Sequence, residues 1–495
     1  MTETFDLLVI GGGINGSGIA RDAAGRGLAV LLAEKDDLAS ATSSASSKLI
    51  HGGLRYLELY EFRLVAEALA EREVLMRVAD HLVWPARFIM PHVPELRPRW
   101  MIRAGLFLYD HLGRRSTLPG SHAVRLDASP YGAGIRPALR HGFAYSDCRV
   151  DDARLVIANA LSAREHGAVI RTRTECVAAN RQAGLWRAQL RAADGAPSEV
   201  RTRAIVNAAG PWVRQVLNDR LAQPSREAVR LVKGSHVVLP KLYPGEHAFI
   251  LQNTDRRVVF MIPFEERYTL VGTTDVPVED ASQPAASAEE VEYLCRAVNR
   301  YLAKPVAPAD VIWRYAGVRP LYDDGTSDPS SITRDYTLHV EDERGAAPVV
   351  SVYGGKITTY RRLAERVLEK LAPYFPGLRQ PWTANAPLPG SGFGPRGRDA
   401  AFAALAARYA GLPQHVLHAV FRRHGLLAAQ VLGDARGAAD LGEDFGAGLT
   451  ERELRYLVER EWARSAEDVL WRRTKAGLHL DARERERVAR ALERP

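Results

Sequence analysis

The segment Asp6-Leu-Leu-Val-Ile-Gly-Gly-Gly-Ile-Asn-Gly16 decides the fold of this 495-residue chain. Its first five residues form a short apolar run, which is typical of a buried parallel strand. Glycines follow with the spacing G-x-G-x-x-G, and the small residues Ser17-Gly-Ile-Ala20 come next. Such glycines permit a tight turn, close approach to a pyrophosphate and close packing of a helix on the strand. The segment therefore predicts a strand and a helix whose N-terminal end faces phosphate groups.

A second apolar run, Leu28-Ala-Val-Leu-Leu-Ala33, ends on Glu34. An acidic residue about twenty positions after such glycines holds a ribose hydroxyl in dinucleotide-binding folds. The combination of strands, glycines, helix and acid predicts an α/β dinucleotide-binding domain. We expect its cofactor contacts at Gly11, Gly13, Asn15, Gly16 and Glu34.

This unit by itself does not distinguish NAD from FAD. Two later segments, 203–212 and 349–359, each have the pattern of an apolar strand followed by a glycine turn. At such turns the backbone can approach a ligand closely, here around Ala209, Gly210 and Gly355. Either segment is also explained as an ordinary turn, because glycine is the usual turn residue. Together they favour FAD, which must be held from its adenine to its isoalloxazine.

The net charge of +8 and the pI of about 9.4 fit an anionic substrate, an anionic lipid surface, nucleic acid or simply an arginine-rich solvated surface. The cysteines Cys148, Cys176 and Cys295 are scattered, so we expect neither a metal site nor a disulfide framework. The N-terminus lacks the pattern of a signal peptide, and no run of about eighteen apolar residues occurs. We expect a cytoplasmic location and leave peripheral membrane contact open.

The segment Ala41-Thr-Ser-Ser-Ala-Ser-Ser-Lys-Leu-Ile-His-Gly-Gly-Leu-Arg-Tyr-Leu57 closely resembles the bacterial aerobic, FAD-dependent sn-glycerol-3-phosphate dehydrogenases. Further motifs that resemble this family follow in its order, namely 145–155, 233–236, 272–275, 315–320, 332–336, 354–356 and Leu470-Trp-Arg-Arg-Thr-Lys475. The resemblance covers nearly the whole chain.

The resemblance implies an FAD-binding domain of the glutathione-reductase, Rossmann-like type, an α+β substrate domain with an antiparallel sheet, and an all-α C-terminal cap. The expected boundaries are 1–85, 145–228 and 319–385 for the FAD-binding domain, 86–144 and 229–318 for the substrate domain, and 386–495 for the cap. It also implies oxidation of glycerol 3-phosphate with ubiquinone or menaquinone as acceptor, at the cytoplasmic face of the inner membrane. It is compatible with a homodimer.

The same resemblance extends the set of expected cofactor contacts beyond the glycine motif. The additional residues are Thr42, Ser43, Ser47, Lys48, Leu49, His51, Gly52, Val177, Gly317, Lys356, Ile357 and Thr358. Among them, Lys356 follows two glycines and would offset the negative charge of the reduced flavin, which raises its potential.

The substrate is a small dianion, and arginine guanidinium groups match phosphate oxygens with parallel N–H donors. By the resemblance, Arg55, Arg319 and Arg334 line the substrate site, together with Tyr56 and Lys356. Arg319 has the apolar, rigid neighbours Gly-Val and Pro, so we expect it near the reacting carbon, where its charge stabilises a forming alkoxide.

A proton acceptor that works near neutral pH is most naturally a histidine. His51 precedes Gly52-Gly53, where the chain can pass close to the flavin, so we predict it as the catalytic base. A histidine that bonds a backbone carbonyl explains the same position equally well. Arg319 is a poor base because guanidinium keeps its proton.

Two segments outside these motifs have helical patterns. Residues 100–109 place aromatic and aliphatic side chains beside arginines, which suits either an interfacial helix or a buried amphipathic one. From Arg396 onward, Ala, Leu, Arg and Glu recur at helical spacing and predict the cap.

Three other functions compete with a quinone-linked dehydrogenase. A glycerol-3-phosphate oxidase that uses oxygen would share the substrate motifs but carry an insertion absent here. A flavin amine or amino-acid oxidase would not need three arginines for a dianion. A nucleic-acid-binding flavoprotein would need a basic groove with stacking aromatics, whereas the basic residues here are spread along the chain.

Overall fold

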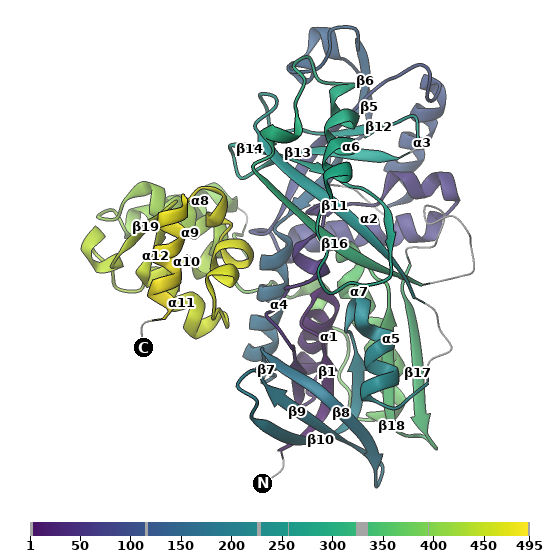
Figure 1. Cartoon of the computed structure of the whole chain (residues 1–495), viewed down its shortest axis with the longest axis vertical. Helices are drawn as coiled ribbons and strands as arrows, with labels where there is room; N and C mark the ends of the chain where they lie inside the picture. Colours follow the sequence, from purple (N-terminus) through teal and green to yellow (C-terminus); the bar gives the residue numbers. More distant parts are fainter. Residues whose placement is uncertain are drawn as a thin grey trace.

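The computed structural model describes residues 3–113, 117–224, 229–255, 257–322, 335–394 and 396–493. Within these ranges the chain forms two large sheets, each with its own helices, and a helical C-terminal cap beside them (Figure 1). The first sheet occupies the lower half of the view in Figure 1 and the second sheet the upper half. This arrangement confirms the predicted fold class.

The first sheet contains the predicted dinucleotide-binding strands. Its central order is β18-β10-β1-β2-β7, and these neighbours run parallel. Antiparallel partners extend it, since β17 pairs with β18 and the β8–β9 hairpin pairs with β10. The strands are β1 (Glu3–Ile10), β2 (Val30–Ala33), β7 (Val169–Arg171), β8 (Thr174–Gln182), β9 (Leu185–Ala192), β10 (Pro197–Asn207), β17 (Thr337–Glu343) and β18 (Ala346–Tyr353).

Helix α1 (Ile14–Gly25) packs between α4 (Asp152–Glu165) and α7 (Tyr360–Leu371). It is buried along most of its length, which explains its small residues. A Cβ atom placed on Gly18, for example, would lie 2.6 Å from the ring of Tyr360 in α7. The sequence Ser17-Gly-Ile-Ala20 thus lets two helices approach each other closely.

The second sheet is mostly antiparallel and has the order β15-β11-β14-β13-β12-β4-β6-β3, with β16 beside β11 and β5 beside β6. Its strands are β3 (Leu49–Ile50), β4 (Val83–Pro91), β5 (His122–Arg125), β6 (His141–Val150), β11 (Val229–Pro240), β12 (Ala248–Gln252), β13 (Val258–Phe264), β14 (Tyr268–Gly272), β15 (Val276–Val278) and β16 (Trp313–Tyr322). Strand residues alternate between two apolar clusters, because successive side chains of a strand point to opposite faces. Helix α6 (Ala288–Asn299) covers one face, and α2 (Phe62–Val78) with α3 (Arg99–Leu112) covers the other.

Three of the expected domain boundaries fall inside strands of the second sheet. The boundary at 85/86 divides β4, that at 144/145 divides β6, and that at 318/319 divides β16. Both sheets draw strands from several stretches of the chain, and an apolar strand has the same local pattern in either sheet. The expected boundaries therefore cut across strands that belong wholly to the second sheet.

The cap is helical as expected, apart from a short antiparallel pair of strands. Its elements are α8 (Gly397–Arg408), α9 (Gln414–His424), α10 (Ala428–Leu432), β19 (Asp444–Gly446), β20 (Leu449–Thr450), α11 (Glu451–Arg460), the π-helical turn η13 (Asp468–Arg473) and α12 (Ala482–Leu492). A buried ion pair between Arg154 of α4 and Glu461 of the cap joins it to the main body. No helix within the described ranges is both long and apolar enough to cross a membrane.

Candidate functional site

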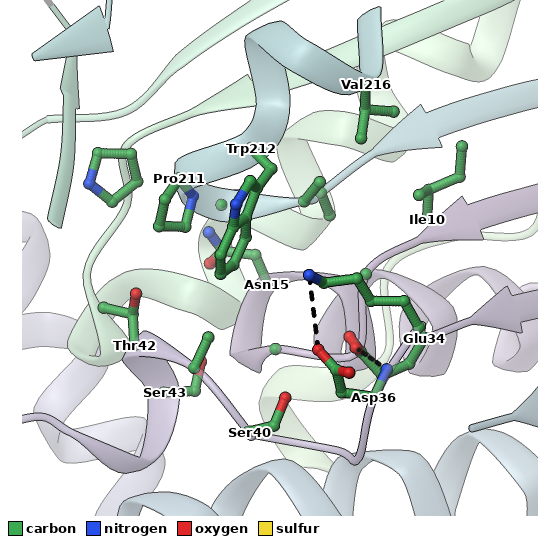
Figure 2. Close-up of a pocket in the computed structure, with 18 of the residues that line it drawn as sticks. Ile10, Asn15, Glu34, Asp36, Ser40, Thr42, Ser43, Pro211, Trp212 and Val216 are labelled. Carbon is green, nitrogen blue, oxygen red and sulfur yellow. Dashed lines mark hydrogen bonds and ion pairs between the residues drawn. The ribbon is translucent and has the colours of Figure 1, made fainter. Parts of the chain in front are cut away.

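A cavity of about 430 Å³ opens at the carboxyl ends of four strands of the first sheet (Figure 2). The residues that end or directly follow β1, β2, β10 and β18 line it, including Ile10, Ala33, Ala208 and Gly354. Ligands of open parallel sheets bind at this edge, beside the central strand. In Figure 2, Pro211 and Trp212 lie on one side of the cavity and Asp36 and Ser40 on the other.

The glycine motif forms the floor of this cavity. Gly11 has φ +109°, a left-handed conformation that favours glycine, and a Cβ atom there would lie 2.6 Å from the carbonyl oxygen of Ala208. A Cβ atom on Gly16 would lie 1.9 Å from the carbonyl oxygen of Gly11. The absence of a side chain at Gly16 therefore lets the first turn of α1 sit directly against the end of β1, and its absence at Gly11 lets the segment after β10 approach the same turn.

Glu34 lies at the end of β2, where the sequence predicts it, and lines the cavity. Its Oε2 accepts a hydrogen bond of 2.6 Å from the Gly12 amide, and its Oε1 accepts one of 2.8 Å from the Asp36 amide. Burial raises the pKa of the Glu34 carboxyl above its ordinary value, although both amides act in the opposite direction. Each carboxylate oxygen has a second lone pair, so the group can still accept from ribose hydroxyls.

Many of the expected cofactor contacts line this cavity. They are Gly11, Gly13, Asn15, Glu34, Thr42, Ser43, Ala209, Gly210 and Gly355. The sequence interpretation missed other lining residues, among them Lys35, Asp36, Thr174 and Trp212. The Lys35 ammonium lies 4.5 Å from the centre of the Trp212 ring. The only local signal for Lys35 and Asp36 was that they directly follow Glu34.

The remaining expected cofactor contacts do not line this cavity. Gly16 supports the floor of the cavity, as described above. Gly317 packs against Ala45, just after the lining residues Thr42 and Ser43, since a Cβ atom on Gly317 would lie 2.8 Å from the Cβ atom of Ala45. Lys48 is buried, and its ammonium lies 2.8 Å from Asp152. The others are Ser47, Leu49, His51, Gly52, Val177, Lys356, Ile357 and Thr358.

Four of the predicted residues meet in a second cluster, between the first helical turn after β3 and the turn after β18. The Lys356 ammonium lies 3.7 Å from the centre of the Tyr56 ring. The His51 amide donates a 3.2 Å hydrogen bond to the Thr358 hydroxyl, which also lies 3.4 Å from the His51 carbonyl oxygen. The hydroxyl of Thr358, predicted as a cofactor contact, therefore holds the backbone of His51.

Arg319 is held by two neighbours on the second sheet. Its Nη1 lies 2.8 Å from the Asp275 carboxylate, and its Nη2 donates a 2.8 Å hydrogen bond to the Thr274 carbonyl. A Cβ atom on Gly234 would lie only 2.2 Å from Nη2, so glycine at 234 makes room for the guanidinium. The sequence interpretation did not assign Asp275 to the site, although it follows two threonines within a motif.

Arg319 directly precedes Pro320, which lines the cofactor cavity together with Gly354 and Gly355. The Pro320 carbonyl oxygen would lie 3.6 Å from a Cβ atom on Gly354, so Arg319 is the chain neighbour of a residue beside the loop that carries Lys356. Arg55 lies half-buried in the helical turn η2 (Leu54–Leu59) beside Tyr56. Arg334, the third predicted phosphate ligand, lies outside the described residues.

His236 is a further histidine at the site, and the sequence interpretation gave it no role. Its Nε2 lies 2.9 Å from the Ser47 hydroxyl, and its ring stacks on Tyr315 with centroids 4.9 Å apart. Burial, together with the charges of Lys48 and Arg319, lowers the pKa of His236 to about 3. His236 therefore remains neutral at physiological pH.

A family model described as "FAD dependent oxidoreductase" matches residues 6–361. The chain belongs to this family of FAD-dependent oxidoreductases. A second model, "C-terminal domain of alpha-glycerophosphate oxidase", matches residues 381–493 and corresponds to the cap. FAD is accordingly the cofactor of this protein.

Individual relatives cover nearly the whole chain. A glycerol-3-phosphate dehydrogenase of Pseudomonas aeruginosa is 54% identical, over 100% of this chain and 96% of its own. A D-erythritol 1-phosphate dehydrogenase of Brucella abortus is 51% identical, over 98% and 96%. The crystal structure of a glycerol-3-phosphate dehydrogenase from Bacillus halodurans, complexed with FAD, is similar with a TM-score of 0.76 and 26% identity, over 99% of this chain and 94% of that one.

The residues of the cavity fit the cofactor that the family requires. A floor without side chains at Gly11 and Gly16 leaves room for a pyrophosphate beside the N-terminal end of α1. Among the described residues, the buried Oδ1 atom of Asn15, which also lines the cavity, has no hydrogen-bond partner. The Glu34 carboxylate is placed to accept hydrogen bonds from the ribose of FAD.

Substitution of Gly16 by valine should abolish FAD binding, because its side chain would collide with the Gly11 carbonyl and displace the first turn of α1. The ratio of flavin absorbance to protein absorbance after purification measures the loss. Gly105→Ala is the matched control, since a Cβ atom at that half-buried position in α3 would have no atom within 4 Å apart from its chain neighbours and its own helix backbone. Normal flavin content in the Gly16→Val variant would contradict the assignment of this cavity.

Proposed function

We propose that this protein oxidises sn-glycerol 3-phosphate to dihydroxyacetone phosphate and passes the electrons to a membrane quinone. The proposal rests on two observations. The Lys356 ammonium lies on the Tyr56 ring, and Arg319 directly precedes Pro320, which lines the FAD cavity. In addition, the chain is 54% identical over its whole length to a glycerol-3-phosphate dehydrogenase. When bound, FAD would supply the hydride acceptor for C2 and the two-electron link to the quinone.

The chain's own residues have to bind the phosphate, orient C2 and accept the hydroxyl proton. We assign the phosphate to Arg55 and Arg334 and the reacting oxygen to Arg319. Arg319 has one guanidinium edge held by Asp275 and Thr274, so its position is fixed before substrate arrives. A preorganised cation costs no reorganisation when the C2 alkoxide charge develops.

His51 is the proposed base. As the C2–H bond breaks, its imidazole takes the hydroxyl proton and the C2–O bond becomes a carbonyl. The contacts of its backbone with the Thr358 hydroxyl fix the position of His51. His236 is a weaker candidate, because a group with a pKa of about 3 gains little from accepting a proton at neutral pH.

The proposed acceptor requires access to a membrane, and α3 provides a surface for it. One face of α3 packs into the core through Ile102, Leu106 and Tyr109. Its opposite face exposes Trp100 by 70% and Phe107 by 57%. Apolar side chains of the adjoining η2 and α2, namely Leu59, Tyr60 and Phe62, are exposed as well. The buried face agrees with the amphipathic-helix interpretation of residues 100–109, and the exposed apolar face supports the proposed interfacial one.

Cationic side chains accompany these exposed apolar residues. Arg99 and Arg103 lie on α3, and Arg63 follows Phe62. Apolar and aromatic side chains with cationic neighbours favour an anionic lipid interface. We propose that this surface holds the protein peripherally on the cytoplasmic face of the inner membrane, and that the protein acts as a homodimer there.

Glycerol 3-phosphate should bleach the oxidised-flavin spectrum of the purified protein in the absence of oxygen, whereas glycerol and amino acids should not. If the flavin stays oxidised, glycerol 3-phosphate is not the substrate, and the assignment of the fold is unaffected. Erythritol 1-phosphate belongs in the same assay, because a relative named for it is 51% identical. Faster bleaching by erythritol phosphate would reassign the substrate.

The same preparation distinguishes the dehydrogenase from an oxidase. Reoxidation of the substrate-reduced flavin should be fast with a soluble quinone and slow with dissolved oxygen. The relatives that span the whole chain are named as dehydrogenases, although the model that matches the cap carries the name of an oxidase. Rapid reoxidation by oxygen alone would establish the oxidase.

Substitution of His51 by asparagine should remove the acidic limb of the pH profile of kcat/KM, because the neutral imidazole is the active form of the base. Arg319→Gln should instead lower kcat by about a hundredfold or more without moving the profile, since it removes charge stabilisation. Steady-state kinetics between pH 5 and 9 measure both effects. An unchanged profile in the His51 variant would exclude His51 as the base.

The double variant Trp100→Ser, Phe107→Ser should bind vesicles of anionic phospholipid at least about tenfold more weakly, because it removes two large side chains from the apolar interface. Co-sedimentation with the vesicles measures the partition. Ile312→Ser, Leu426→Ser is the matched control, since these side chains are exposed by 49% and 44% outside α3. Equal losses in the two double variants would exclude α3 as the membrane surface.

A further inference from the structure

The motif Leu470–Lys475 belongs to the cap in sequence, yet its side chains contact the main body in three places. Trp471 stacks on Trp313 of β16, with ring centroids 4.6 Å apart. The Lys475 ammonium lies 3.3 Å from Asp151, the residue that caps α4. Arg472 and Arg473 both bind Asp37. This short segment of the cap therefore contacts the second sheet, the start of α4 and the loop that follows β2.

The contact with Asp37 is the most deeply buried of the three. Arg473 binds it through two parallel hydrogen bonds, of 2.6 Å from Nη1 to Oδ2 and 2.8 Å from Nη2 to Oδ1. Arg472 adds a bond of 2.7 Å from Nε to Oδ2. The Asp37 and Arg473 side chains are 2% and 0% exposed. Two guanidinium groups from the end of the chain thus converge on one carboxylate near its beginning.

Asp37 lies within the loop that forms the ribose side of the cofactor cavity, between lining residues Asp36 and Ala39. Glu34, Lys35 and Asp36 line that cavity directly, and Asp37 follows them without a gap. Within the loop, the Asp36 amide donates to the Glu34 carboxylate, as described above. The position of Asp37 therefore limits where the Glu34 carboxylate can lie.

The cap holds the same loop a second time, through Arg173. The Arg173 amide donates a 2.7 Å hydrogen bond to the Asp36 carbonyl, while its side chain lies 2.6 Å from Asp468 of the cap. Asp468 also binds Arg472. Two routes thus connect η13 with residues 36 and 37.

We propose that the cap is a cofactor clamp: Arg473 and Arg472, acting through Asp37, position the loop that carries Glu34 and thereby set the affinity for the adenosine half of FAD. These arginines are positioning residues, since they act on the cofactor through another side chain. Because binding linkage is reciprocal, FAD binding in turn stabilises the docked cap. The inference rests on FAD as cofactor and is independent of the substrate and acceptor proposed above.

The choice of an ion pair at this junction suits a clamp. Loss of one partner of a buried pair leaves an uncompensated charge inside the protein, which is far less favourable than loss of an apolar contact of similar size. The loop therefore has one well-defined docked position. An apolar contact would tolerate small displacements of the loop that move Glu34 away from a ribose.

Arg473→Gln and Asp37→Asn should each raise the dissociation constant of FAD for the apoprotein at least about fivefold, the lower end of typical coupling between sites. Quenching of flavin fluorescence measures the constant. The inhibition constant of ADP as competitor should rise by the same factor, because ADP contains the adenosine half alone. An unchanged ADP constant would overturn the assignment to the ribose loop.

Arg422→Gln is the matched control. Arg422 of α9 pairs with Glu265 of the main body, so this variant also breaks a partly buried ion pair between cap and body. Neither residue lines the cofactor cavity; both line a separate recess. FAD affinity should be unchanged in this control. Equal loss of affinity in Arg422→Gln and Arg473→Gln would show a general effect of cap stability and overturn the clamp.

Hydrogen exchange tests the reciprocal effect. Amides of α11 in the cap should exchange more slowly when FAD is added to the wild-type apoprotein, and this FAD dependence should be lost in Arg473→Gln. If Arg473→Gln does not fold, Arg472→Gln serves instead, because Arg473 still compensates the Asp37 charge in that variant. If FAD does not change the exchange rates of the α11 amides in the wild-type protein, the proposed coupling between FAD binding and cap docking is wrong.

Discussion

The rest of the structure depends on the absence of a side chain at Gly16. A Cβ atom there would lie 1.9 Å from the Gly11 carbonyl oxygen, closer than any pair of non-bonded atoms can come. Because Gly16 has no side chain, α1 can begin shortly after β1, and the N-terminal end of the helix points into the cavity. Helices α4 and α7 then pack against α1. Asp152 is the first residue of α4 and binds Lys48, and Thr358, in the turn before α7, binds the backbone of His51. One steric constraint thus orients three helices.

The parts of this fold that the sequence predicts are those encoded within about thirty consecutive residues. The strand, glycine turn, helix and terminal acid at Glu34 follow from local spacing, and the structure has them where expected. The assignment of β4, β6 and β16 to the second sheet was not predictable in the same way. Arginine, together with proline or aspartate, interrupts the apolar pattern of each of these strands, and only pairing with distant strands decides which sheet it joins.

The same distinction separates the predicted from the missed residues of the site. His51, Tyr56, Lys356 and Thr358 belong to motifs whose order resembles a known family, and the structure brings them together across about three hundred positions. Asp275 and His236 lie in such motifs as well, but their contacts with Arg319 and Ser47 depend on the register of antiparallel strands. A residue type and its neighbours do not reveal that register.

The net charge predicts little about function, because the charged side chains near the cofactor region are mostly paired with side chains of opposite charge. The net charge of +8 is consistent with several partners. In the structure, Lys48 is neutralised by Asp152, Arg319 by Asp275, and Arg473 by Asp37, each at 2.6–2.8 Å. These pairs contribute nothing to the net charge, yet they fix the segments on which the cofactor and the proposed substrate groups lie. Since a buried pair is destabilising once broken and only modestly stabilising when intact, its main physical effect here is to restrict each segment to one position.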